Sequence, residues 1–249
     1  PQRLLANCGA LASAHEYHLQ RFLFEYFPGG TACGEMPEVS VPAELPCADV
    51  TAFSIDDATT TEIDDAFSVT PRAGGGVRVG IHIAVPALGV AIASAFDVVA
   101  RERLSSVYFP GQKITMLPAP VVAAYSLAAG CVCPALSLYA DVAADGAIVA
   151  THSRSERVTI AANLRHGELS QVFNPDALAA GPIAHEYGAQ LEWLWHFAQR
   201  LQAARGKADA EGEQRAEYSF YIDGEQVSIV ERERGTPIDK VVSELMIYA

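Results

Sequence analysis

The chain has 249 residues, of which 50% are hydrophobic, and this composition excludes disorder as a description of the whole chain. Its 17 basic and 30 acidic residues give a formal net charge of −13, the opposite sign to that of a protein binding a polyanion through a broad basic surface. Five cysteines without repeated spacing favour a reducing compartment, and no run approaches the roughly 18 apolar residues of a membrane helix. We therefore expect a cytoplasmic protein without membrane contact.

The first segment predicts a helix followed by a connector. Leu11 to Phe27 carry a rough stripe of apolar side chains at helical spacing, and Pro28 to Pro46 are rich in Pro, Gly and Ala. We interpret residues 1–48 as the end of an upstream domain and its connector.

The most informative stretch is Ile55–Phe67, IDDATTTEIDDAF, which places five carboxylates between two apolar, strand-like runs. Like charges repel and burial raises the pKa of a carboxylate, so a site that keeps several of them ionised needs a cation. Mg²⁺, with Mn²⁺ as a substitute, suits a short acidic loop because it takes one or two carboxylates, waters and phosphate oxygens. The alternative is a solvated acidic turn. Strict strand alternation would send Asp64 and Asp65 to opposite faces, so a site using both needs a twist or bulge.

Periodicity and turn signals predict the elements that follow. They are a strand over Val77–Val85, a helix over Ala93–Leu104, two strands within Ala135–Ile160 joined at Ala144–Gly146, a helix over Ile183–Arg205, a hairpin of Tyr218–Ile222 and Val227–Val230 around Asp223–Gly224, and a helix that Thr236 opens. Arg154, Arg157 and Arg165 are candidates for phosphate contacts.

The acidic stretch also resembles a family signature. Asp56, five residues, Glu62, one residue, and then Asp64 and Asp65 are similar to the pattern of the ribonuclease II catalytic domain, the RNB domain. Further segments resemble landmarks of that family in the same order: VGIHIAVP (Val79–Pro86), RERLSSVYFPGQKITMLP (Arg101–Pro118), PALSLYADVAADGAI (Pro134–Ile148) and TPIDKVVSELMIYA (Thr236–Ala249).

The resemblance implies an α+β fold, with a twisted, mostly antiparallel sheet flanked by helices. It implies that residues 49–249 are the amino-terminal part of an RNB-like catalytic domain, truncated at its C-terminus. The intact enzyme is then expected to be a monomeric, Mg²⁺-dependent 3′-to-5′ exoribonuclease that hydrolyses single-stranded RNA to nucleoside 5′-monophosphates. The missing half of the domain and a basic RNA-binding domain would complete it, and the fragment alone is expected to be inactive.

The resemblance also implies roles for individual residues. Asp56, Glu62 and Asp65 would hold Mg²⁺, and Asp64 would orient the attacking water or the leaving 3′ oxygen. Tyr108 would stack on a base of the RNA, and His166, where the family often has a tyrosine, would take a similar place. The chain departs from the family pattern at three positions: Glu62 replaces an aspartate, Val85 replaces an acid, and His166 replaces a tyrosine.

Two other functions are compatible with these residues. One is a catalytically inactive RNA-binding or scaffold module of the same fold, which the three departures and the acidic balance favour. Retention of the clustered aspartates argues against it, because clustered charge is costly to keep without a use. The other is a metal-dependent phosphoesterase acting on different substrates.

Overall fold

The computed structural model describes residues 2–10, 13–109, 111–207, 216–223, 226–233 and 235–249. Contacts divide the chain into two compact units. The first comprises Pro1–Glu38, Val90–Ala119 and Phe220–Ser228, and the second comprises Val39–Gly89, Pro120–Ser219 and Ile229–Ala249. The predicted acidic site lies entirely in the second unit.

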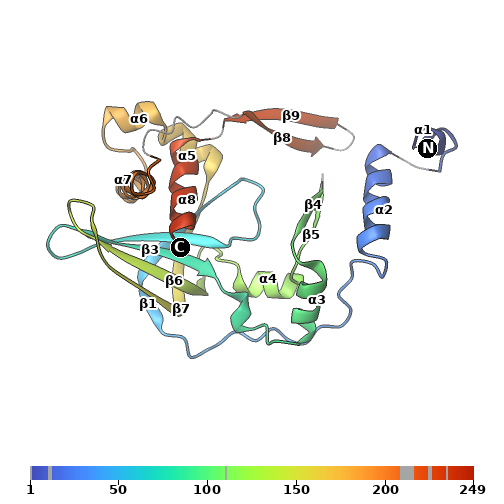
Figure 1. Cartoon of the computed structure of the whole chain (residues 1–249), viewed down its shortest axis with the longest axis horizontal. Coiled ribbons are helices and arrows are strands. Elements are labelled where there is room, and N and C mark those ends of the chain that lie inside the picture. The colour runs from blue at the N-terminus through green and yellow to red at the C-terminus, as the bar shows by residue number, and fades with distance from the viewer. Residues whose placement is uncertain (1, 11–12, 110, 208–215, 224–225, 234) are drawn as a thin grey trace. The chain divides into compact units, whose positions relative to one another are not determined.

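Five strands of the second unit form a closed barrel (Figure 1). In barrel order they are β1 (Cys47–Asp56), β2 (Asp65–Pro71), β3 (Val77–Ala84), β6 (Val132–Val142) and β7 (Ile148–Arg165). Every neighbouring pair is antiparallel except β1 and β7, which run parallel. The predicted α+β class with a mostly antiparallel sheet is confirmed, whereas closure of that sheet into a barrel was not predicted.

The 18-residue strand β7 explains the closure. Its first part pairs with β6, from Ile148 opposite Val142, and its second part pairs with β1, as far as Arg165 opposite Asp56. A strand long enough to pair on both edges can join the two ends of a sheet, which removes the exposed edges.

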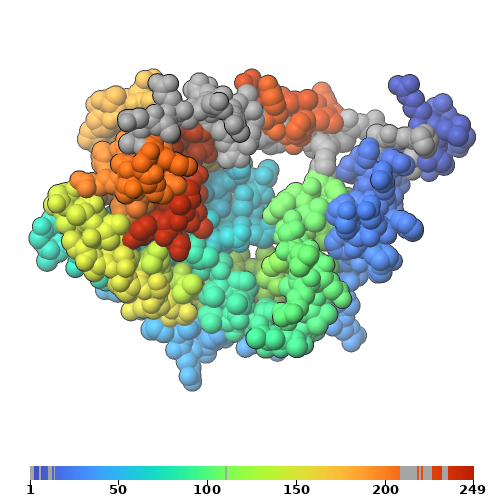
Figure 2. Space-filling model, in the orientation of Figure 1, coloured from blue at the N-terminus to red at the C-terminus, as the bar shows by residue number. Residues whose placement is uncertain are grey.

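Helices α5 (His166–Val172), α6 (Pro175–Ala180), α7 (Gly188–Ala204) and α8 (Pro237–Tyr248) follow the barrel strands in the second unit. Figure 2 shows the atoms of α7, in orange, directly against those of α8, in red. The main core cluster joins strands to helices and includes Phe53, Phe67, Ile81, Leu191, Leu194, Phe197, Ile238, Val241 and Leu245. A second cluster uses alternate strand residues such as Ala52 and Ala66, together with Ile63 of the acidic loop and Leu127.

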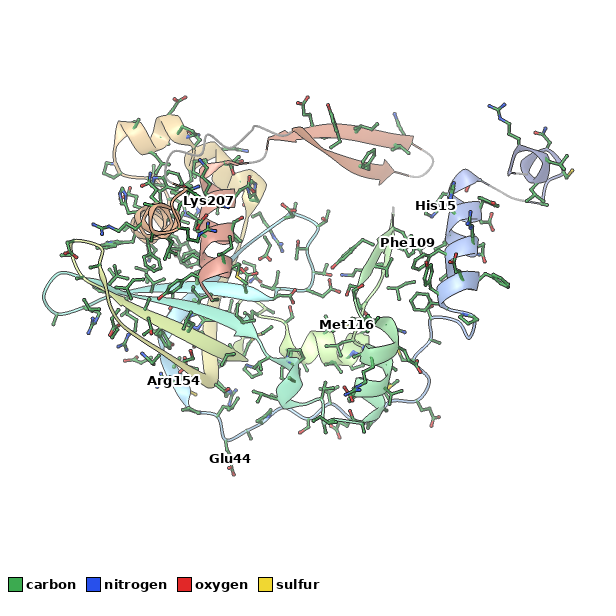
Figure 3. The ribbon with its side chains drawn as sticks, in the orientation of Figure 1. His15, Glu44, Phe109, Met116, Arg154 and Lys207 are labelled. Carbon is green, nitrogen blue, oxygen red and sulfur yellow. The ribbon has the colours of Figure 1, made fainter. Side chains whose placement is uncertain are left out.

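A polar network lies on β3, β6 and β7. The Tyr139 hydroxyl donates to Oε1 of the fully buried Glu156 over 2.6 Å. Arg154, labelled in Figure 3, places its Nε 2.5 Å from Oε2 of the same carboxylate. Arg78 donates two hydrogen bonds to Asp141. Arg154, a candidate for phosphate contact, is therefore already paired with an acid.

The helix that Thr236 opens is confirmed, with the predicted cap. The Thr236 side chain accepts from the Asp239 N–H, and the Asp239 side chain accepts from the Thr236 N–H, which is a capping box. Pro237 occupies the first turn, where a backbone N–H would have no hydrogen-bond partner within the helix, so its missing N–H costs nothing.

The remaining elements of this unit include the 3₁₀ helix η1 (Pro86–Leu88) and most of α4 (Ala119–Tyr125).

The first unit holds α1 (Gln2–Asn7), α2 (Ala14–Tyr26), α3 (Ala95–Arg103), β4 (Val107–Phe109) and β5 (Gln112–Ile114). The predicted helices over Leu11–Phe27, Ala93–Leu104 and Ile183–Arg205 are present with narrower limits, although residues 11 and 12 lie outside the described residues. The predicted hairpin is formed by β8 (Ala216–Asp223) and β9 (Gln226–Glu233), and its turn residue Gly224 lies outside the described residues. Within the described segments, every helix is too short or too polar to cross a lipid bilayer.

Candidate metal and active site

The acidic loop connects two barrel strands. Asp56 is the last residue of β1 and Asp65 is the first residue of β2, so the loop brings both strand ends together. Asp56, Glu62 and Asp65 are partly buried and Asp64 is exposed. Asp64 stands just before β2, its carbonyl accepts a hydrogen bond from the Ala84 N–H of β3, and it is exposed whereas Asp65 is partly buried. The twist or bulge that a site using both acids needs stays a prediction.

The carboxylates of the loop raise one another's pKa values. Burial raises the pKa of Asp65, and the nearby Asp56 and Asp64 charges raise it further, to about 6. The pKa of Asp64 is also raised, first by partial desolvation, although much of its surface is open to solvent, and then by the Glu62 charge. The pKa of Asp56 is raised mainly by burial, although a hydrogen bond from Ser54 and the charge of Arg165 act in the opposite direction. A group of acids with raised pKa values is stabilised by a cation placed among them.

The donor set fits a hard divalent cation. The Oδ2 atom of Asp65 is buried and has no hydrogen-bond partner among the described residues, and an unpaired buried carboxylate oxygen is costly. Within the described part of the chain, no group of three or more His, Cys, Asp or Glu side chains is arranged to hold a metal ion, so the protein side chains do not by themselves form a complete metal site. Mg²⁺ needs only one or two carboxylates from a protein, because waters and phosphate oxygens of a substrate fill its other positions.

Two sets of hydrogen bonds hold the loop, one from the end of β7 and one from the residues that follow α4. Nη1 of Arg165 donates to the backbone carbonyls of Asp57, at 2.9 Å, and Thr60, at 3.2 Å. The Ile63 N–H donates to Ser126 Oγ, and the Leu127 N–H donates to the Ile63 carbonyl, both at 2.9 Å. Arg165, which the sequence suggested for phosphate contact, therefore supports the backbone of the acidic loop.

Sequence reasoning missed two residues behind Asp56. Ser54 Oγ donates to Asp56 Oδ2 over 2.5 Å, and Asn163 Nδ2 donates to Ser54 Oγ over 2.8 Å. Ser54 stands two residues before Asp56, so the two-residue period of a strand places both on one face. Asn163 is a polar residue within the apolar run that ends β7. These two signals were present in the sequence, but only the β1–β7 pairing relates them to each other.

The two predicted base-stacking residues are on different elements. Tyr108 is on β4 in the first unit and its side chain is 70% exposed. His166 begins α5, and its Nε2 lies 3.1 Å from Asp239 Oδ1 in the capping box of α8. Although burial raises the pKa of Asp239, hydrogen bonds from His166 and Thr236 lower it overall, to about 2. His166 thus has a structural partner, and base stacking by either residue stays a prediction.

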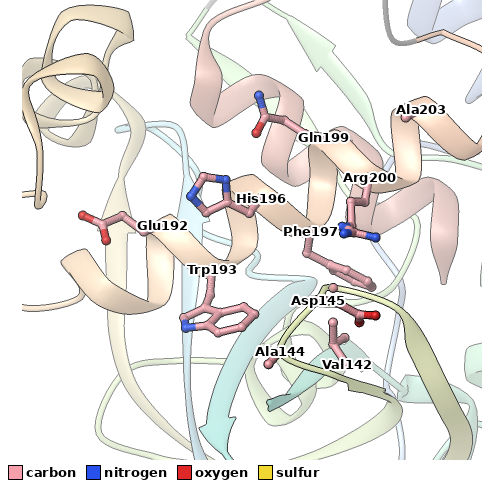
Figure 4. A pocket seen from close by; sticks show the side chains of 11 residues that line it. Val142, Ala144, Asp145, Glu192, Trp193, His196, Phe197, Gln199, Arg200 and Ala203 are labelled. Atoms are coloured by element: carbon pink, nitrogen blue, oxygen red, sulfur yellow. The ribbon is translucent and has the colours of Figure 1, made fainter. Parts of the chain in front are cut away.

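A cavity of about 600 Å³ lies at the other end of the barrel (Figure 4). It is lined by α7, including Trp193, Phe197 and Arg200, and by the β6–β7 turn around Asp145. Val142 in its wall pairs with Val77 of β3, and Val77 pairs on its other side with Pro71, at the opposite end of β2 from Asp65. At 3.3 Å per strand residue, Pro71 and Asp65 are roughly 20 Å apart. The cavity therefore contains none of the predicted site residues.

Comparison with known proteins agrees with the sequence resemblance. The family model of the RNB domain matches residues 46–249. Exoribonuclease 2 of Proteus mirabilis is 30% identical over 216 residues, which are 83% of this chain and 33% of that protein. A protein of Arabidopsis thaliana named inactive exonuclease DIS3L2 is 43% identical over 84 residues, 34% of this chain and 8% of its own length.

The fold agrees as well. The solved structure of Mycoplasma genitalium RNase R in complex with ribose methylated single-stranded RNA covers 83% of this chain and 32% of its own chain, with a TM-score of 0.66 at 17% identity. The chain thus spans about a third of the length of exoribonuclease 2 and of RNase R. On the RNB match, which includes the whole barrel and the acidic loop, the chain belongs to the RNB-domain family.

Proposed function

We propose that this chain contributes the metal-binding part of a Mg²⁺-dependent exoribonuclease. The enzyme would hydrolyse single-stranded RNA from its 3′ end and release nucleoside 5′-monophosphates. The observation that carries the proposal is the group of neighbouring carboxylates between β1 and β2, with a buried, unpaired Asp65 oxygen, inside the matched RNB domain. The relatives named exoribonuclease 2 and RNase R support the substrate class.

The four acids have different surroundings, which suit different roles. Asp56, Glu62 and Asp65 are partly buried and would hold the cation, whereas the exposed Asp64 would contact the attacking water or the leaving oxygen. Bound Mg²⁺ would stabilise the entering and leaving oxygens of an in-line displacement. Water attacks the last phosphorus, the bond from phosphorus to the 3′ oxygen breaks, and the 3′ oxygen takes a proton. Arg165 keeps the loop backbone in place while this occurs.

The test uses the complete protein with 5′-labelled single-stranded RNA. We expect stepwise shortening from the 3′ end in Mg²⁺, no shortening in EDTA, and a loss of at least a hundredfold in rate for Asp64→Asn. Asp145→Asn, in the β6–β7 turn at the far end of the barrel, is the matched control and should shorten RNA like the wild type. Analysis of the products by chromatography should show nucleoside 5′-monophosphates. Shortening that persists in EDTA or in Asp64→Asn contradicts the proposal.

The relatives are also compatible with a second function, an RNA-binding or scaffold module without activity. Two proteins of Arabidopsis thaliana are each 43% identical over 84 residues, one named DIS3-like exonuclease 2 and the other inactive exonuclease DIS3L2, so this match supports the two functions equally. The same assay separates the two functions, because such a module would retard the labelled RNA in a gel and leave its length unchanged. A panel of phosphomonoesters and phosphodiesters in place of RNA examines the third possibility, a phosphoesterase with other substrates.

A further inference from the structure

Three side chains behind the acidic loop form a partly buried relay of hydrogen bonds, Asn163 to Ser54 to Asp56. Asn163 Nδ2 donates to Ser54 Oγ over 2.8 Å, and Ser54 Oγ donates to Asp56 Oδ2 over 2.5 Å. Ser54 is 0% exposed. A hydroxyl has a single hydrogen, and an ionised carboxylate can only accept, so Ser54 gives its hydrogen to Asp56 and accepts from Asn163.

The orientation of the Asn163 amide is determined independently of Ser54. Its Oδ1 accepts from the Ala129 N–H over 2.8 Å, so the oxygen faces that backbone. Its Nδ2 donates to the Leu127 carbonyl over 2.9 Å as well as to Ser54. Because backbone groups hold both atoms of the amide, the direction in which Asn163 Nδ2 points toward Ser54 does not depend on Asp56.

The same backbone segment holds the middle of the acidic loop. The side-chain Oγ of Ser126 accepts from the Ile63 N–H, and the Leu127 N–H donates to the Ile63 carbonyl, both at 2.9 Å. Ile63 stands between Glu62 and Asp64 and is only 4% exposed. Segment 126–129 therefore connects the strand end that carries Asp56 with the part of the loop that carries the other acids.

We infer that Ser54 and Asn163 are positioning residues that orient Asp56 and thereby set the affinity of the acidic loop for a divalent cation. The inference rests on the proposed function for the assignment of Asp56 as a metal ligand. The hydrogen bond from Ser54 uses Oδ2 and fixes the plane of the carboxylate, with the other oxygen left for the cation. A ligand already held in its bound orientation loses less freedom on binding, and removing the hydrogen-bond partner of a metal ligand typically lowers metal affinity 10- to 100-fold.

The experiment measures binding of Mn²⁺ alone to the complete protein, by the electron paramagnetic resonance signal of the free ion. Ser54→Ala should weaken binding roughly 10- to 100-fold. Ser54→Thr keeps the hydroxyl and should restore affinity to within about threefold of the wild type. The matched control is Ser137→Ala, because Ser137 is also 0% exposed and hydrogen-bonds His82 Nδ1 at 2.7 Å, away from the relay. This variant should lower thermal stability but leave Mn²⁺ affinity within about twofold.

A second variant tests whether the relay acts as a unit. Asn163→Ala should weaken Mn²⁺ binding by itself, because Ser54 loses the donor that directs its hydroxyl toward Asp56. Combined with Ser54→Ala it should add little, since residues in one hydrogen-bond network are not additive. If the losses of Mn²⁺ affinity in the two single variants simply add in the double variant, the relay is overturned. It is also overturned if Ser54→Ala binds Mn²⁺ as tightly as the wild type. An equal loss in Ser137→Ala would assign the effect to folding and also overturn it.

RNA shortening measured in parallel separates this inference from the proposed function. If Mn²⁺ binding falls in Ser54→Ala as expected but the wild type never shortens RNA, the relay stands and the exoribonuclease proposal fails. If the wild type shortens RNA but binds no Mn²⁺ through Asp56, as shown by an unchanged affinity in Asp56→Asn, the inference is overturned while the activity stands. If both stand, saturating metal should restore most of the rate of Ser54→Ala.

Discussion

The guanidinium of Arg165 donates a hydrogen bond to the backbone carbonyl of Asp57, and this contact ties the end of β7 to the first turn of the acidic loop. Because the same nitrogen also reaches the Thr60 carbonyl, one side chain spans the loop residues that separate Asp56 from Glu62. The parallel pairing of Asp56 with Arg165 makes this geometry available.

Replacement of Arg165 by Met should loosen the acidic loop. Amide hydrogen exchange in residues 57–62 should accelerate, and metal-dependent RNA shortening should slow by roughly tenfold, while the free energy of unfolding falls by only about 1 kcal/mol, as for the loss of a typical hydrogen bond. Arg157→Met, the same charge change on the same strand, is the control and should leave exchange in the loop unchanged. Equal exchange rates in both variants would contradict a supporting role for Arg165.

The raised pKa of Asp65 predicts a pH-dependent effect of Asp65→Asn in the metal-free protein. The folded protein holds a proton on Asp65 up to about pH 6, whereas the unfolded chain releases it near 3.8. The resulting contribution to stability is present below pH 3.8 and is lost as pH rises through 6, so at pH 7 the Asp65 charge destabilises the fold. The shift of about two pKa units corresponds to at most roughly 3 kcal/mol.

In EDTA at pH 7, Asp65→Asn should therefore raise the free energy of unfolding by about 1 to 3 kcal/mol, and the gain should vanish near pH 4. Urea denaturation at several pH values measures it. Because the metal binds only the charged form, Mg²⁺ should stabilise the wild type more than the variant. If Asp65→Asn is less stable than the wild type at pH 7 in EDTA, the charge of Asp65 does not destabilise the folded protein and the prediction is wrong.

We expect the buried His82 to make the folded protein less stable in acid. It is 0% exposed, its two ring nitrogens lie 2.8 Å from Ser68 Oγ and 2.7 Å from Ser137 Oγ, and burial lowers its pKa to about 4. The unfolded chain takes up a proton near pH 6.5, so the stability from neutral His82 is complete above 6.5 and is lost as pH falls through 4. The shift corresponds to roughly 3 kcal/mol.

His82→Gln should be less stable than the wild type at pH 7 but should lose less stability between pH 6.5 and 4. The comparison isolates His82, because the carboxylates that titrate in this range are common to both proteins. His185→Gln, the same substitution at a partly exposed histidine, is the control. Parallel curves for His82→Gln and the wild type would contradict the assignment.

Tyr139→Phe should destabilise the barrel by about 1 to 3 kcal/mol. The change removes the hydroxyl that donates to Glu156 and leaves a fully buried carboxylate with one partner fewer. Tyr187→Phe keeps the ring packed on Phe53 and should change the free energy of unfolding by less than about 0.5 kcal/mol. Thermal and urea unfolding of the three proteins measure both effects, and equal stabilities of the two variants would contradict a role for the Tyr139 hydroxyl.

The sequence by itself determined the local features of this protein. Alternation in Val77–Ala84, the cap at Thr236 and the Asp145–Gly146 turn each depend on neighbouring residues, and the corresponding strand, helix and hairpin are present. The spacing of Asp56, Glu62, Asp64 and Asp65 likewise carried the family resemblance, which the RNB match confirms. The roles of these acids stay predictions.

Only the tertiary structure decided how the acidic site is supported. Ser54 and Asn163 are far apart in the chain, and nothing local to either indicates that they lie opposite each other; the parallel pairing of β1 with β7 does so. The same pairing turns Arg165 toward the acidic loop, and packing against α8 gives His166 a partner in Asp239. Contacts between distant segments arise from the closure of the barrel, and periodicity within a single strand carries no information about which strand will lie beside it.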